Sequence, residues 1–316
     1  MTKEDLRIVY MGTPDFAVES LKALVEGGYN VVAVITMPDK PMGRHGSVLQ
    51  PSPVKQYAVE HGLKVMQPEK LKDPEFVEEL RSLKADLQIV VAFRMLPEVV
   101  WSMPPLGTFN AHASLLPKYR GAAPINWAVI NGDTETGITT FFLKHEIDTG
   151  DIIQQVRIPI ADTDNVEVVH DKLMELSGKL VTETVDNIIA GTVTSISQDD
   201  IKGVELTPAP KIFRDTCRID WSKPNKKVYD FIRGLSPYPA AWTTLNGKSI
   251  KIYEATKEDG SLEPGEIATD GTSYLKIGTG EGILNVKVLQ LEGKKRMPVA
   301  DLLRGFKLPE GKQICQ

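Results

Sequence analysis

Short apolar runs bounded by turn residues recur through the first two-thirds of the chain. Runs of this length and continuity are typical of strands buried on both faces of a sheet. The pattern predicts such strands at Leu6–Met11, Val31–Thr36, Ala85–Phe93 and Gly107–His112. Glu135–Leu143 and Ile152–Ile160 are predicted as two further strands.

Capping residues indicate helices between these runs. Thr13, Ser52 and Asp73 each precede a proline, and a capping side chain followed by proline in the first turn is typical of a helix N-terminus. Glycines at 27, 28 and 62 would end the first two of these helices. Two more helices are predicted over roughly residues 121–131 and 165–189.

Alternating strands and helices predict an α/β fold with an open, doubly wound, mostly parallel sheet of the Rossmann-like kind. Ligands of such sheets bind beyond the carboxyl ends of the strands. The loops after residues 10, 36, 93, 112 and 143 are therefore the expected location of a functional site.

The pattern changes beyond residue 190. Thr, Ser, Gln, Asp and two prolines accumulate over 191–210, which predicts a linker. A helix near 225–234 is followed by short alternating segments separated by turns such as Asn246-Gly247 and Asp270-Gly271. These features predict a small antiparallel barrel or sandwich, and an OB-like barrel is favoured because such barrels commonly bind oligonucleotides. The expected domains are thus a catalytic domain over 1–190, a linker over 191–210 and an OB-like domain over 211–316.

Charge separates the same two regions. Residues 1–208 hold 19 Lys and Arg against 29 Asp and Glu, a net of −10, whereas residues 209–316 hold 18 against 13, a net of +5. A basic minority domain attached to an acidic majority is typical of a polyanion-binding appendage. Ordinary solvation of a small domain explains the same excess, and charge alone leaves both explanations open.

Composition excludes several classes of protein. The 316 residues are 41% hydrophobic and 25% charged, which is ordinary globular usage and enough for about two domains. The acidic start, Met1–Asp5, resembles neither a secretory signal nor a transit peptide, and no apolar run approaches the ~20 residues of a membrane span. We therefore expect a cytoplasmic protein. Two cysteines and five histidines without paired spacing predict neither a disulfide framework nor a metal site.

Asn110 and His112 are candidate catalytic residues. In a strand ending at His112 their side chains share one face and reach its carboxyl end. An amide and an imidazole there can donate to a developing oxyanion. Asp148, in the loop after the next strand, is the natural carboxylate to orient the imidazole and relay protons. A core histidine and a turn-forming aspartate explain the same spacing.

The segment around these residues resembles the 10-formyltetrahydrofolate-dependent formyltransferases. Asn110-x-His112-x-Ser114-Leu-Leu-Pro, then Arg-Gly-Ala-Ala-Pro-Ile from residue 120 and Asp148-Thr-Gly downstream, match that family's signature. The resemblance implies that Asn110, His112 and Asp148 are the catalytic trio. It also implies direct transfer of a formyl group from folate to a substrate amine through a tetrahedral intermediate.

Further motifs resemble the branch of the family that formylates initiator methionyl-tRNA. These are Met11–Phe16, and Pro38–Arg44 continuing to Lys55. The resemblance implies that the loop after the second strand inserts at the acceptor end of the tRNA, with Arg44 at a tRNA-contacting position. Lys40, Lys55, Lys248 and Lys251 are further expected tRNA contacts, and we expect a monomer that uses no metal and no membrane.

Two segments are the expected folate site. The resemblance implies that Ser114, Leu115, Leu116 and Pro117 bind the formyl donor, together with Phe93, Arg94, Met95 and Leu96. Family members commonly have Tyr-Gly where this chain has Phe93-Arg94, so the shape of the pterin pocket is expected to differ there. His145 precedes Asp148 where small or apolar residues are commoner, and is either a further proton-handling residue or a solvated loop residue.

Other functions compete with this interpretation. A formyltransferase for an amino sugar nucleotide shares the Ser-Leu-Leu-Pro region, but it does not need the insert over residues 38–55. A purine-pathway formyltransferase would leave about 100 C-terminal residues unexplained, and a tRNA-binding module without activity would not need Asn110, His112 and Asp148 intact. Trp221, Tyr238 and Trp242 are candidates to stack on bases, with packing in a barrel core as the alternative.

Overall fold

The computed structural model describes residues 1–308 and 311–316, including every side chain among them except that of Arg44. The chain forms two compact units. One consists of Met1–Gly121, Thr136–Ile158 and His170–Pro208, and the other of Ala122–Glu135, Pro159–Val169 and Ala209–Gln316. Two stretches of the expected catalytic domain therefore group with the residues that follow 208.

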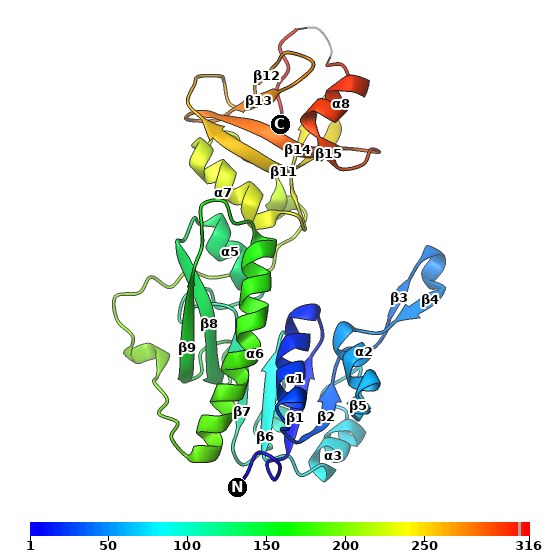
Figure 1. Ribbon diagram of the computed structural model, residues 1–316, viewed down its shortest axis with the longest axis vertical. Helices are drawn as coiled ribbons and strands as arrows, with labels where there is room; N and C mark the ends of the chain where they lie inside the picture. Colours follow the sequence, from blue (N-terminus) through cyan, green and yellow to red (C-terminus); the bar gives the residue numbers. More distant parts are fainter. Residues whose placement is uncertain (309–310) are drawn as a thin grey trace. The chain divides into compact units, whose positions relative to one another are not determined.

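The first unit is built on a seven-stranded sheet with the order β5-β2-β1-β6-β7-β8-β9 (Figure 1). The strands are β1 Ile8–Gly12, β2 Val31–Ile35, β5 Val65–Met66, β6 Leu87–Val91, β7 Thr108–His112, β8 Glu135–Phe142 and β9 Ile152–Pro159. β5, β2, β1, β6 and β7 pair in parallel, and β8 runs antiparallel to β7. Every residue of β1 and β6 is buried, as expected for parallel strands that are covered on both faces.

Helices connect these strands. They are α1 Asp15–Glu26, α2 Pro53–Glu60, α3 Pro74–Ser82, α4 Glu98–Trp101, the long α6 Val166–Ala190, which begins in the second unit, and the 3-10 turn η2 Gln198–Asp200. Ser52 and Asp73 cap α2 and α3 as expected, since their side chains accept from backbone N–H groups of the first turn. The expectation for Thr13 is wrong. Its hydroxyl accepts from the backbone N–H of Met37 at 3.4 Å, and α1 begins without a side-chain cap.

The insert after β2 is a hairpin where a loop was expected. β3 Lys40–Met42 and β4 Val48–Gln50 pair antiparallel around the 3-10 turn η1 Arg44–Gly46. All six strand residues are exposed. Figure 1 shows this hairpin extending away from α2.

The second unit contains a six-stranded antiparallel sheet ordered β10-β11-β14-β13-β12, with β15 beside β14. The elements of the unit are α5 Pro124–Ile130, η3 Asp215–Cys217, α7 Asn225–Leu235, β10 Ala241–Leu245, β11 Lys248–Glu258, β12 Ile267–Thr269, β13 Leu275–Gly278, β14 Ile283–Leu291, β15 Met297–Pro298 and α8 Val299–Gly305. Buried side chains of these strands and of α7 and α8 form its core.

Ion pairs and hydrogen bonds connect residues 122–135 and 159–169 to α7. Asp230 is 2% exposed and accepts from Lys226 and Arg233. The Arg233 guanidinium also donates to the carbonyl oxygens of Ala161 and Asp164, and the Asn126 amide donates to the Gly234 carbonyl. Because these contacts satisfy buried polar groups, the stretches 122–135 and 159–169 fold with the C-terminal unit.

The predicted fold class is confirmed. A Rossmann-like, mostly parallel sheet is followed by an antiparallel domain consistent with an OB-like fold. Within unit 1, strands β1, β2, β6, β7, β8 and β9 all lie within the predicted runs to within a residue or two.

Candidate active site

His112 ends β7, and two interactions fix its ring. The side chain is 8% exposed, and its Nε2 lies 2.8 Å from the carbonyl oxygen of Tyr119. A carbonyl only accepts, so Nε2 carries a proton and donates it. The ring also meets Phe141 edge-on, with centroids 6.4 Å apart. This leaves Nδ1 as the nitrogen free to exchange a proton.

The Asp148 carboxylate faces that nitrogen. Its Oδ2 is 3.8 Å from His112 Nδ1 and accepts a 2.9 Å hydrogen bond from the backbone N–H of Gly121. At 3.8 Å the two side chains are an ion pair when His112 is protonated, but they do not share a direct hydrogen bond.

The loop that presents Asp148 has an unusual backbone. Asp148 has a φ of 56°, in the left-handed region that L-residues rarely adopt. Two residues on, a Cβ at Gly150 would lie 1.5 Å from the Phe142 carbonyl oxygen. Only glycine fits there, so packing requires the glycine of the Asp-Thr-Gly sequence.

Asn110 lies on β7 two residues before His112, in register with Val90 of β6 and Phe141 of β8. Its side chain is half-buried, whereas Phe109 and Ala111 on either side are buried. The structure therefore brings Asn110, His112 and Asp148 to the carboxyl end of β7 and the loop after β8, within one compact unit.

The expected folate segment at 114–117 is mostly buried. Ser114 is 0% exposed, and its hydroxyl donates to the Lys118 carbonyl. Leu116 is 2% exposed; its N–H donates to Thr139, and its carbonyl accepts from Gln155. Any contribution of these residues to a ligand would come from the shape of the loop rather than from their polar side-chain atoms. Leu115 is half-buried and Pro117 is buried.

Arg94 is anchored in the second expected folate segment. Its guanidinium donates to the carbonyl oxygens of Glu69, at 2.9 Å, and of Pro68. Burial lowers the pKa of this group. Met95 beside it is 69% exposed, whereas Phe93 is half-buried and Leu96 is buried. The guanidinium thus holds the 68–69 segment against the loop that follows β6.

The expected tRNA contacts around the hairpin differ in availability. Lys40 is exposed on β3. Lys55 on α2 is engaged instead: its ammonium lies 2.8 Å from the Asp39 carboxylate. Hydrogen bonds from Lys55 and Gln67 lower the pKa of Asp39. Arg44 begins η1 on the exposed hairpin, and its side chain lies outside the described residues.

In the second unit, Lys248 and Lys251 are both exposed on β11. The three aromatic candidates differ. Trp221 is 5% exposed and donates to the Thr243 hydroxyl, so it belongs to the core, whereas Tyr238 is 82% exposed. Trp242 is half-buried, and the guanidinium groups of Arg214 and Arg218 lie 5.6 and 5.7 Å from its ring centroid.

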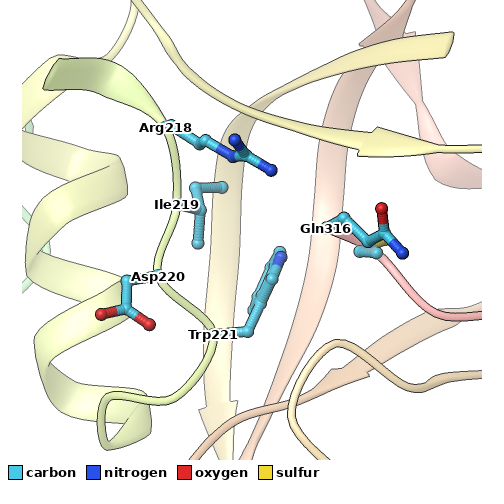
Figure 2. Close-up of a pocket in the computed structure, with 6 residues that line it drawn as sticks. Arg218, Ile219, Asp220, Trp221 and Gln316 are labelled. Atoms are coloured by element: carbon cyan, nitrogen blue, oxygen red, sulfur yellow. The ribbon is translucent and has the colours of Figure 1, made fainter. Parts of the chain in front are cut away.

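A pocket of about 380 Å³ lies in this second unit. Its lining is formed by Arg218, Ile219, Asp220, Trp221, Cys315 and Gln316. Figure 2 shows Arg218, Ile219, Asp220 and Trp221 along one segment and Gln316 on another. None of the expected catalytic or folate residues lines this pocket.

His145 is a solvated loop residue. It is 73% exposed, with Nε2 3.5 Å from Glu98 and its ring edge-on to Trp101. Among residues 1–308 and 311–316, no three His, Cys, Asp or Glu side chains are grouped to hold a metal ion. No helix in the described part of the chain is long and apolar enough to cross a membrane.

Comparison with protein families identifies this architecture. Residues 6–185 match the formyl transferase family, and residues 211–307 match the formyl transferase C-terminal domain. The chain belongs to the formyl transferase family.

Relatives within the family match almost the whole chain. A methionyl-tRNA formyltransferase of Bacteroides fragilis is 69% identical over 318 residues, covering 98% of both chains. A methionyl-tRNA formyltransferase of Porphyromonas gingivalis is 49% identical over 320 residues, again covering 98% of both. The similarity thus extends through both compact units.

Solved structures share the fold. HypX from Aquifex aeolicus, in complex with tetrahydrofolic acid, has a TM-score of 0.64 at 20% identity, over 94% of this chain and 47% of its own. An N-formyltransferase from Helicobacter canadensis, in complex with folinic acid and dTDP-3-aminofucose, has a TM-score of 0.66 at 20% identity, over 92% of this chain and 100% of its own. These likenesses concern the fold alone.

Three groups that contact the residues of the site were not predicted from the sequence. They are the Tyr119 carbonyl that holds His112, the Gly121 N–H that holds Asp148, and the side chain of Gln198. The first two are backbone groups, which do not depend on the identity of a side chain. Gln198 lies in the stretch that was expected to be a linker.

Proposed function

We propose that this protein transfers the formyl group of 10-formyltetrahydrofolate to the α-amino group of methionine on initiator methionyl-tRNA. The observation that carries the proposal is the meeting of His112 and Asp148, 3.8 Å apart, at the carboxyl end of β7. Family membership and the methionyl-tRNA formyltransferases that match 98% of the chain support it.

The chemistry follows from the state of the imidazole. The substrate amine attacks the formyl carbon, a C–N bond forms, and the carbonyl oxygen becomes an oxyanion. With Nε2 committed to the Tyr119 carbonyl, a proton on Nδ1 makes His112 an imidazolium whose charge Asp148 balances. That N–H and the Asn110 amide donate to the oxyanion.

Proton transfer completes the reaction. Asp148 accepts a proton from the attacking amine, directly or through a water, and returns that proton to folate N10 as the bond from the formyl carbon to N10 breaks. The products are formylmethionyl-tRNA and tetrahydrofolate. No covalent bond to the protein forms at any step.

We further propose a division of roles along the chain. Residues 1–190 supply the chemistry and hold folate near 93–96 and 114–117, and residues 211–316 bind tRNA through exposed lysines such as Lys248 and Lys251. Arg44 and Lys40 on the hairpin contact the acceptor end, and a single chain is sufficient for activity. The exposure of the hairpin and the net charge of +5 over 209–316 support this division.

The direct test is a formyl-transfer assay with three acceptors: initiator methionyl-tRNA, elongator methionyl-tRNA and an amino sugar nucleotide. We expect turnover with initiator methionyl-tRNA far above the other two. Arg44→Ala should slow the initiator substrate more than the elongator one. Efficient formylation of the sugar nucleotide, with none of methionyl-tRNA, would replace this proposal by the sugar-modifying alternative.

A further inference from the structure

Gln198 is a buried polar side chain beside the catalytic loop. It lies in η2 and is 3% exposed. Its Nε2 donates to the carbonyl oxygens of Asp148 and Gly150, each at 2.8 Å. Its Oε1 accepts from Arg120, at 3.1 Å from Nε and 2.8 Å from Nη2. One side chain therefore joins three segments that are distant in sequence.

These partners require an amide in this orientation. A primary amide offers two N–H donors and one oxygen with two acceptor sites, and here both donors and the oxygen are engaged. Turning the amide over would set its oxygen against two carbonyl oxygens and its NH₂ against a guanidinium. Neither a carboxylate nor an apolar side chain of the same size can satisfy both sides.

The two carbonyl groups that Gln198 holds flank Thr149. They belong to the turn in which Asp148 has a φ of 56°, and such a conformation persists only where the surroundings over-determine it. The same turn directs the Asp148 carboxylate to the Gly121 N–H at 2.9 Å and towards His112 Nδ1 at 3.8 Å.

The segment that carries Gln198 is itself anchored within the first unit. Ile196 makes backbone hydrogen bonds in both directions with Ile152, the first residue of β9, at 2.8 and 2.9 Å. Further on, the Thr207 carbonyl accepts from the backbone N–H of Tyr119, the residue whose own carbonyl holds His112. Gln198 therefore acts from a fixed support.

We propose that Gln198 is a positioning residue for formyl transfer. By clamping the carbonyl groups of Asp148 and Gly150, it sets where the Asp148 carboxylate lies relative to His112. It touches neither substrate nor the reacting atoms. The inference rests on the proposed function, because it assigns Gln198 a role through Asp148.

The informative variant is Gln198→Glu. It keeps the side-chain length and still accepts from Arg120, but it loses both donors and sets a carboxylate oxygen against the two carbonyl groups. Because small misplacements of a catalytic group are costly, kcat should fall about 10- to 100-fold. The KM values for tRNA and formyl donor should change little.

Gln154→Glu is the matched control. Gln154 is half-buried on β9, and its oxygen accepts from the Thr184 hydroxyl, so this variant should keep wild-type kcat.

A double-mutant cycle separates positioning from general stability. In an Asp148→Ala background the carboxylate is gone, so Gln198→Glu should cause no further loss of kcat. Multiplied losses would overturn the inference. Melting temperatures are recorded for every variant, and Gln198→Met, which removes the donors without adding charge, replaces Gln198→Glu if that protein does not fold.

The two proposals fail in different ways. If Asp148→Ala turns over near the wild-type rate, or the wild type does not formylate methionyl-tRNA, the proposed function is wrong. If Asp148→Ala is slow while both Gln198→Glu and Gln198→Met keep wild-type kcat, the proposed function stands and the role of Gln198 is wrong.

Discussion

In the first compact unit, the side chains of His112 and Asp148 are 8% and 11% exposed, whereas every residue of β3 and β4 is exposed. The His112 ring and the Asp148 carboxylate each have a backbone partner, the Tyr119 carbonyl for the ring and the Gly121 N–H for the carboxylate. The hairpin is held by a ladder of three paired residues and a hydrogen bond from the Gly46 N–H to the Gly43 carbonyl.

Under the proposed function, this difference corresponds to two kinds of task. Proton transfer and oxyanion stabilisation depend on groups held to within a fraction of an ångström, and buried hydrogen bonds provide that. An RNA end is bound by a surface, and the hairpin presents apolar side chains that the fold does not use: Met42, Val48 and Leu49 are 50%, 61% and 64% exposed.

The largest expected effect tests the buried site. His112→Ala should lower kcat by about 100- to 10,000-fold, because a positioned proton carrier and oxyanion donor is lost. Single-turnover formylation measures the rate, and filter binding should show unchanged tRNA affinity. His61→Ala, at an exposed histidine on the C-cap of α2, is the control. Near-normal turnover of His112→Ala would remove this histidine from the mechanism.

The next effect tests the exposed hairpin. Leu49→Ser should raise the KM for methionyl-tRNA about 10-fold, because the burial of one leucine against RNA contributes roughly 1.4 kcal/mol or more. The kcat and melting temperature should not change. Val59→Ser on α2 is the control, at an apolar residue that is 60% exposed. Equal KM values for the two variants would show that the hairpin side chains do not meet the RNA.

Local sequence rules predicted the frame that carries the buried site. Continuous apolar runs gave the strands, Ser52 and Asp73 gave two helix starts, and the spacing of Asn110 and His112 placed both on β7. These features depend on neighbours in sequence and on burial of whole strands, which a single chain reveals.

The rest depends on contacts between distant segments. Gln198 lies in a polar stretch, and its neighbours in sequence do not indicate that its amide donates to the carbonyl groups of Asp148 and Gly150. The Thr13 hydroxyl does not cap α1, because it accepts a hydrogen bond from the backbone N–H of Met37, which follows β2. The hairpin over 40–50 was missed because its exposed strands of three residues carry no burial pattern.

Replacing Arg94 tests whether the loop after β6 contributes to binding of the formyl donor. Arg94→Ala removes the donors to the Pro68 and Glu69 carbonyl groups, and the free energy of unfolding should fall by about 1–3 kcal/mol in urea titrations. If the loop borders folate, its displacement should weaken donor binding, and the KM for the donor should also rise about 3-fold. Arg81→Ala, at an exposed arginine of α3, is the control. A stability loss with an unchanged donor KM would make Arg94 a structural clamp only.

The smallest expected effect concerns the basic surface of the second unit. Lys251 and Lys257 lie on the same strand, but Lys251 is exposed, whereas the Lys257 ammonium is 2.9 Å from Asp162. If exposed lysines contact phosphates, log affinity for tRNA falls linearly with log salt, with a slope of about −0.9 per neutralised phosphate in a duplex. Lys251→Ala should then reduce the slope by about one unit and weaken binding equally for initiator and elongator tRNA. Lys257→Ala should leave the slope unchanged, because Asp162 already balances its charge. Identical slopes for wild type and both variants would show that this strand does not contribute phosphate contacts, and the search for them would then turn to the hairpin.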